Sequence, residues 1–152
     1  MKRLTNIAGF KTTTEFVADK VCRLEKMEKT FCSIFSIVFE NSKNTLAEWS
    51  NGYKIQKITY GECEEDINFL SPNFEKALSF LEKGSMVGLY MDNSVNWIKT
   101  FWCILKSGYN PLLLNAKLPK SVLETILKTH SVSAVISDGE VFSVTTLNVL
   151  DL

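Results

Sequence analysis

The sequence predicts an α/β fold, specifically part of a doubly wound, largely parallel sheet flanked by helices, with an N-terminal helical region and a β-hairpin. Short apolar runs of strand length alternate with amphipathic helical segments in the second half of the chain, which is typical of βαβ units. An Asn51-Gly52 pair separates two strand-like segments in the first half. The 152 residues, 45% of them hydrophobic, suit one domain or part of a larger one.

Two helical patterns precede residue 45. The pattern over residues 14–29 aligns five apolar side chains on one stripe, with Lys and Glu opposite: Phe16, Val17, Val21, Leu24 and Met27. Residues 31–39 carry the apolar spacing of a second helix, although their alternation of Phe, Ser and Ile also fits a strand. We therefore expect an N-terminal helical region over residues 1–44 and an α/β region over residues 45–152.

Residues 45–60 predict a β-hairpin. The Asn51-Gly52 pair tolerates the positive φ angles that a two-residue type I′ turn needs. The second arm, residues 53–60, is rich in aromatic and β-branched residues, which favour strands.

Residues 62–82 predict a helix that Pro72 interrupts. The apolar positions keep a helical phase through the whole segment. Because proline lacks an amide hydrogen, Pro72 should kink or restart the helix, with Ser71 as the cap of the restart. Lys83-Gly84 then supplies a C-terminal stop.

Beyond Gly84, three strands alternate with two helices. We expect the strands at residues 86–91, 111–114 and 133–137. The first helix should begin at Asp92-Asn93-Ser94 and end at Gly108, and the second should begin near Pro119.

The end of the sequence favours truncation inside a larger sheet. Residues 141–152 stay apolar and β-prone to the last residue, and three parallel strands are few for a doubly wound domain. A cut sheet exposes an edge strand with unpaired backbone groups, so we expect the chain to form a dimer. We place this edge at residues 134–137 or 141–147. A turn at Asp138-Gly139 that folds residue 141 onward into a hairpin would cover it instead.

Charge and cysteine content exclude several classes of function. Seventeen basic and seventeen acidic residues cancel and form no cationic block, which excludes nucleic acid as a main partner. No apolar run is long enough for a membrane span, and no apolar segment follows residues 1–6. The cysteines form no C-x-x-C pair and lie in apolar stretches, which predicts buried, reduced thiols and a cytoplasmic location; they are Cys22, Cys32, Cys63 and Cys103.

We assign no catalytic, cofactor-binding or metal-binding residue from the sequence. The seven glycines build no phosphate-binding loop. His130, the only histidine, follows a helix C-terminus, where a cation complements the helix dipole, and Cys103 lies in an apolar helix. The acidic residues of the segment 62–66 fit the first turns of a helix for the same electrostatic reason. The aromatic residues of the 94–106 helix favour core packing over a ligand pocket; they are Trp97, Phe101 and Trp102.

Several short motifs follow one another in order between residues 58 and 138. The first, Ile58-Thr59-Tyr60-Gly61-Glu62-Cys63, places Thr-Tyr before a helix. It resembles the opening motif of the AMP-forming acyl-CoA synthetases, within the adenylate-forming ligase (AMP-binding enzyme) family. Residues 87–97 resemble the strand, Asn-Ser turn and tryptophan-bearing helix that follow. Leu105-Lys106-Ser107-Gly108-Tyr109 resembles the Leu-Lys-Ala-Gly turn, with Ser107 where alanine is usual. Residues 111–115 and 131–138 resemble the next two strands, with Asn115 replacing a common Asp and the motif proline displaced to Pro111.

The resemblance implies an ATP-dependent reaction in which a carboxylate becomes an acyl-adenylate and CoA then displaces AMP. ATP, Mg and CoA are expected for a full-length parent, and no cofactor for this chain. The family's phosphate loop, acidic ribose-binding residue and C-terminal lysine have no counterpart in the sequence. The resemblance therefore implies an inert N-terminal fragment, truncated before the phosphate loop, whose partner is the remainder of the parent ligase.

Two other functions stay open on the residues alone. The chain could be a free-standing α/β binding or interaction module that keeps the scaffold without the chemistry. It could also be a small flavodoxin-like domain, for which Asp92-Asn93-Ser94 is the only candidate phosphate loop.

Overall fold

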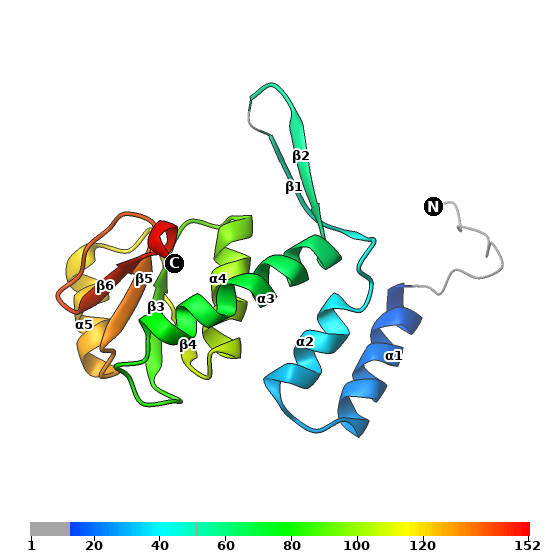
Figure 1. Cartoon of the computed structure of the whole chain (residues 1–152), viewed down its shortest axis with the longest axis horizontal. Coiled ribbons are helices and arrows are strands. Elements are labelled where there is room, and N and C mark those ends of the chain that lie inside the picture. Colours follow the sequence, from blue (N-terminus) through cyan, green and yellow to red (C-terminus); the bar gives the residue numbers. More distant parts are fainter. Residues whose placement is uncertain (1–12, 51) are drawn as a thin grey trace. The chain divides into compact units, whose positions relative to one another are not determined.

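The computed structural model describes residues 13–50 and 52–152, and its contacts divide the chain into two compact units, Met1–Glu40 and Asn41–Leu152 (Figure 1). The domain division expected from the sequence, into residues 1–44 and residues 45–152, remains a prediction. The sequence-based predictions for residues 1–6, Asn51 and the side chain of Phe16 concern parts of the chain that the structure does not describe.

The first unit contains two helices, α1 (Thr13–Lys26) and α2 (Phe31–Phe39), so the helical interpretation of residues 31–39 is confirmed. Thr30 caps α2 by accepting a hydrogen bond from the Ser33 amide at 3.2 Å. The Glu40 carboxylate binds Lys20 and Arg23 of α1 at 3.1 and 2.6 Å, which ties the end of α2 to α1.

Two cysteines of the first unit correct the sequence prediction. Cys22 and Cys32 are exposed, whereas the apolar pattern predicted four buried thiols. The prediction was wrong because two short helices bury few side chains, and in α2 only Phe35, Ile37 and Phe39 are buried.

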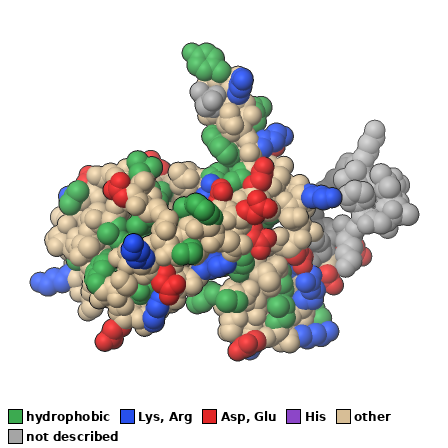
Figure 2. Space-filling model, viewed as in Figure 1, with side chains coloured by type: hydrophobic (Ala, Val, Ile, Leu, Met, Phe, Trp, Pro, Cys, Tyr) green, Lys and Arg blue, Asp and Glu red, His purple; other side chains and the backbone are tan. Residues whose placement is uncertain are grey.

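The predicted hairpin is present in the second unit as β1 (Thr45–Ser50) and β2 (Ile55–Thr59). Its connection differs from the predicted two-residue turn, because Ser50 pairs with Ile55, so four residues separate the paired ends of the two strands. Gly52 keeps a positive φ of 92° in this loop. The hairpin projects at the top of the view in Figure 2 with hydrophobic and basic side chains at its end, where Tyr53 is 98% exposed.

Helix α3 (Tyr60–Ala77) begins directly after β2 with a capping box. The Thr59 hydroxyl accepts a hydrogen bond from the Glu62 amide at 3.2 Å, and the Glu62 carboxylate accepts one from the Thr59 amide at 2.8 Å. These bonds satisfy two backbone donors that the first turn of a helix leaves without intrahelical partners.

Helix α3 runs through Pro72 without a restart, which corrects the role predicted for Ser71. The Ser71 hydroxyl does not cap a new helix but donates a 2.6 Å hydrogen bond to the Ile67 carbonyl, one turn earlier. The helix also ends at Ala77, before the predicted Lys83-Gly84 stop. Gly84, with a φ of 85°, instead turns the chain into the next strand.

Four parallel strands form the main sheet: β3 (Met86–Tyr90), β4 (Asn110–Leu113), β5 (Ala134–Ser137) and β6 (Thr145–Asn148). Their order is β4-β3-β5-β6. The structure confirms the α/β class and the three predicted strands, and it adds β6. Because β6 pairs in parallel with β5, the hairpin considered for residue 141 onward does not form. The short 3-10 helix η1 (Val149–Asp151) follows β6.

Helices cover both faces of this sheet (Figure 1). Helix α4 (Val95–Lys106) packs between α3 and the strands β3 and β4. Helix α5 (Lys120–Thr129) covers the opposite face, where Leu123 and Leu127 join a buried cluster with Leu114 and Val135. Gly88 of β3 permits this contact, since a Cβ atom there would lie 2.9 Å from Val135 Cγ2.

The two tryptophans of α4 should differ in their contribution to stability. Trp102 is only 9% exposed, whereas Trp97 is half-buried and stacks on Phe101. We predict that Trp102→Ala lowers the free energy of unfolding by about 3–5 kcal/mol, as other large core truncations do, and that Trp97→Ala lowers it less. Chemical denaturation followed by circular dichroism measures both. Equal losses would contradict the placement of α4.

The capping box of α3 gives a second prediction, which depends on pH. Hydrogen bonds from the Thr59 amide and then its hydroxyl hold the pKa of Glu62 below its usual value. Ionised Glu62 therefore stabilises the fold above the unfolded pKa of about 4.3, and this contribution disappears as the pH falls through the lower folded pKa. We expect Thr59→Ala to cost about 1 kcal/mol at pH 7.

The control for this prediction is Thr59→Ser, which keeps the hydroxyl and should stay near the wild type. Glu62→Gln should make stability less dependent on pH between about 5 and 3. Thermal unfolding at several pH values measures this dependence. An unchanged pH profile in Glu62→Gln would show that the capping box does not form in solution.

Candidate functional site

The carboxyl ends of β3 and β4 form one side of a hollow of about 410 Å³. In open α/β sheets, ligands bind beyond the carboxyl ends of the strands, where successive connections leave in opposite directions. Strand β3 meets this condition, because β4 follows it on one side and β5 lies on the other. The hollow is lined by the end of β4, by the segments that follow β3 and β4, and by one residue of α4: Met91, Asp92, Asn93, Trp97, Leu113, Leu114, Asn115, Ala116 and Lys117.

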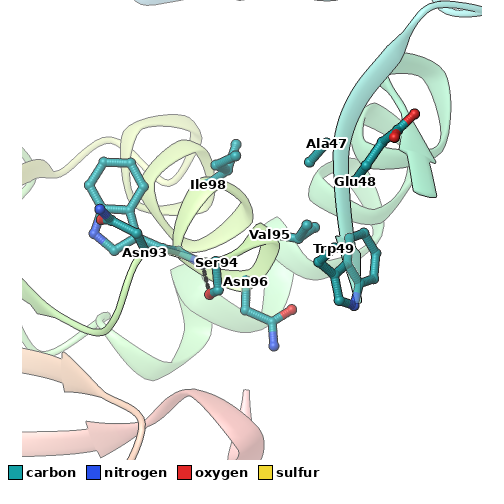
Figure 3. A pocket seen from close by; sticks show the side chains of 9 residues that line it. Ala47, Glu48, Trp49, Asn93, Ser94, Val95, Asn96 and Ile98 are labelled. Atoms are coloured by element: carbon teal, nitrogen blue, oxygen red, sulfur yellow. Dashed lines mark hydrogen bonds between the residues drawn. The ribbon is translucent and has the colours of Figure 1, made fainter. Parts of the chain in front are cut away.

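A second hollow, of about 710 Å³, lies between strand β1 and the start of α4 (Figure 3). Ala47 and Trp49 project from the hairpin, and Val95 and Ile98 project from the helix, so the facing walls are mostly apolar (Figure 3). Trp49 is 44% exposed, which shows that this hollow is an open groove and not an enclosed cavity.

Asn93 and Trp97 line both hollows and so connect them. The Trp97 ring stacks on Phe101 at a centroid distance of 5.7 Å, with the ring planes 5° apart. The sequence favoured core packing for the aromatic residues of this helix. That prediction is confirmed for Trp102, whereas Trp97 forms part of a groove wall.

The segment Asp92-Asn93-Ser94 caps α4, as its sequence predicted. The Ser94 hydroxyl accepts a hydrogen bond from the Trp97 amide at 3.1 Å. This bond occupies one of the amide groups that a helix N-terminus would otherwise offer to an anion.

Acidic residues of α3 act as structural partners. Glu62 belongs to the capping box, and Asp66 forms a 2.6 Å ion pair with Lys99 of α4. Within residues 13–50 and 52–152, no three His, Cys, Asp or Glu side chains come close enough to hold a metal ion.

The two buried cysteines lie in the α3 and α4 helices. Burial raises the pKa of both the Cys63 and the Cys103 thiol to about 11, so neither forms a thiolate near neutral pH. Cys103 Sγ lies 3.7 Å from the Ile67 carbonyl oxygen, between α3 and α4. His130 is exposed at the C-terminal cap of α5, the position that its sequence predicted.

The groove is therefore suited to binding, because its walls combine apolar side chains with the amides Asn93 and Asn96. Sequence reasoning missed this groove. Trp49 and Val95 lie far apart in the chain and line the same groove only in the folded structure, so no local sequence pattern indicates it. No helix in the described part of the chain is both long and apolar enough to cross a bilayer.

Comparison with known proteins gives one family. The model of the AMP-binding enzyme family matches residues 39–150. Among solved structures, the Klebsiella oxytoca NpsA N-terminal subdomain in complex with 3-hydroxybenzoyl-AMSN is similar, with a TM-score of 0.66 and 20% sequence identity. That match covers 80% of this chain and 30% of the NpsA chain. No curated protein sequence matches the chain.

Two further structures have a similar fold. The o-succinylbenzoate CoA synthetase MenE from Bacillus subtilis, in complex with its acyl-adenylate OSB-AMP, has a TM-score of 0.55 and 18% identity. That match covers 63% of this chain and 26% of MenE. NpsA-ThdA, an artificially fused adenylation–PCP di-domain from Klebsiella oxytoca, has a TM-score of 0.64 and 20% identity over 78% of this chain and 23% of its own.

These comparisons agree with the architecture described above. The structural matches, at 18–20% identity, support the fold alone, and this chain spans about a third or less of their length. The family model covers the whole hairpin and all four strands of the parallel sheet. The chain therefore belongs to the AMP-binding enzyme family, whose N-terminal subdomain fold it shares.

Proposed function

We propose that this chain is the N-terminal part of an AMP-forming acyl-CoA synthetase. In this reaction a carboxylate attacks ATP to give an acyl-adenylate and pyrophosphate, and CoA then displaces AMP. The observation that carries the proposal is the family match over residues 39–150, together with a fold that spans about 30% of the NpsA subdomain. We propose that residues 45–152 form a partial α/β subdomain and that the phosphate loop of the parent enzyme follows it in the sequence.

The residues of this chain do not fit magnesium-ATP by themselves. Backbone cradles for phosphates need clustered glycines, and the seven glycines of the sequence are scattered. In the part of the chain that the structure describes, no group of three acidic or other ligating side chains could hold magnesium. We therefore assign ATP and magnesium binding to residues of the parent enzyme that have no counterpart here.

The more specific part of the proposal is the molecule that accepts the acyl group, which is either CoA or a carrier protein. MenE is a CoA synthetase, whereas the NpsA-ThdA fusion joins an adenylation domain to a PCP domain, so the fold occurs with both kinds of acceptor. The string Tyr109-Asn110-Pro111-Leu112-Leu113-Leu114-Asn115, which resembles the acyl-CoA synthetases, favours CoA. Supplying the parent enzyme with CoA or with a carrier protein would separate the two acceptors.

A free-standing binding module is the second candidate. The complete hydrogen bonding of the buried polar groups favours it, because every buried polar side-chain atom in the described residues has a hydrogen-bond partner. The reading frame beyond Leu152 separates the candidates. A continuing frame that encodes a Thr-Ser-Gly-type loop supports the ligase, and a stop codon supports the module.

We predict that the isolated chain neither binds ATP nor forms acyl-adenylate. The physical reason is the missing phosphate cradle, without which no set of backbone amides holds the triphosphate. Calorimetric titration with magnesium-ATP should give no heat of binding at micromolar to millimolar concentrations. Pyrophosphate exchange with a panel of carboxylates should stay at background.

The matched control is the same titration on a chain extended by downstream sequence that carries the loop, which should bind. Micromolar ATP affinity of the 152-residue chain itself would contradict the assignment of the nucleotide site to the rest of the enzyme.

A further inference from the structure

The groove between β1 and α4 has two apolar walls. Ala47 and Trp49 form the wall on the hairpin, and Val95 and Ile98 form the wall on the helix (Figure 3). Trp49 is exposed, and the other three side chains are only half-buried. A contiguous apolar surface of this kind marks a site that another molecule or segment covers.

The hairpin itself has little support away from its base. Ile58 of β2, near the base, is buried where the hairpin packs on α3, whereas Ile55 at the other end of the strand is 69% exposed. Among the described strands, β1 pairs only with β2. A hairpin of two strands is marginally stable in water unless further strands or a helix support it. A third strand can supply this support by adding to the other edge of β1.

The charges around the groove decide which kind of occupant fits. Among the described residues that line it, Glu48 is the only charged one, and it forms a 2.7 Å ion pair with Lys57. ATP and CoA carry several negative charges, and an apolar groove without a lining cation would desolvate these charges without compensation. An uncharged, largely apolar polypeptide fits instead, because the amides of Asn93 and Asn96 can bind its backbone.

We propose that this groove is filled by an extended, apolar segment of the parent enzyme, which lies along β1 and covers Val95 and Ile98 of α4. The inference rests on the proposed function, since it requires the rest of the ligase. The NpsA match covers 30% of that chain, so more than half of an enzyme of that size is available to supply the segment. The groove is then an interface within the enzyme and not a substrate site.

Cysteine accessibility tests the proposal. In the background protein, the exposed cysteines are replaced, by Cys22→Ser and Cys32→Ser, and the two buried cysteines are kept. Ala47→Cys then probes the hairpin wall, and Ile98→Cys probes the α4 wall. Both thiols should react with a maleimide in the 152-residue chain. In the full-length enzyme they should react at least about 100-fold more slowly, because a covered thiol reacts only when the segment opens.

Val122→Cys is the matched control. Val122 is 42% exposed, close to the 44% of Trp49, and it lies on α5, which covers the opposite face of the sheet from α4. Its thiol should react equally fast in both proteins. Adding CoA or magnesium-ATP to the 152-residue chain should leave all three rates unchanged. Protection of Ala47→Cys or Ile98→Cys by either compound would identify a ligand as the occupant and overturn the proposal.

Two further results would contradict the proposal. One is a full-length enzyme in which the groove thiols react as fast as they do in the 152-residue chain. The other is equal slowing of Val122→Cys, which would show that the protection is not specific to the groove. If such an enzyme forms acyl-CoA, the proposed function stands and only the assignment of the groove fails. A reading frame that stops after Leu152 refutes both.

Discussion

The contact between α3 and α4 is the interaction on which the Asn41–Leu152 unit depends. Two hydrogen bonds cross it, one at the residue before Pro72 and one five residues before it. The buried Ser107 hydroxyl donates to the Ser71 carbonyl at 3.0 Å, and the Cys103 thiol lies 3.7 Å from the Ile67 carbonyl. Proline removes one backbone donor from α3, yet the helix continues through Pro72 to Ala77 while it packs against α4. A buried polar contact of this kind tolerates little sliding, so it fixes the relative position of the two helices.

Both halves of the candidate groove follow from that contact. Helix α4 packs on β3 and β4 and carries Val95 and Trp97, while the start of α3 continues directly from β2 of the hairpin. Close packing holds the hairpin base as well, since Gly61 at the start of α3 lies against Ser42 with no room for a side chain. The groove between Trp49 and Val95 is thus defined by backbone geometry. The same geometry supplies no phosphate cradle, which is why we interpret this part of the enzyme as scaffold.

Local patterns predicted most of the elements, because each has its own chemical signal. Ser94 marked the start of α4, Gly108 marked its end, and the apolar run at residues 134–137 marked a strand buried on both faces. Predictions that depended on tertiary partners were wrong. Pro72 was expected to kink or restart α3, whereas the helix continues through it, because the packing of α3 against α4 depends on residues far away in the sequence. The parallel placement of β6 could not be predicted because its short connection resembles a turn. The groove had no local signal, and the family resemblance rested on ordered motifs spread over residues 58–138.

The central claim is that residues 41–152 form a folded scaffold without nucleotide or the rest of the enzyme. Amide hydrogen exchange of the isolated chain, measured by nuclear magnetic resonance without ligand, tests it most directly. We expect the slowest exchange in β3, β5 and the α3–α4 contact, with faster exchange in the hairpin loop, because protection follows buried hydrogen bonds. Uniformly fast exchange with retained helical circular dichroism would contradict this expectation. That result would mean that residues 41–152 need further residues or a ligand in order to fold.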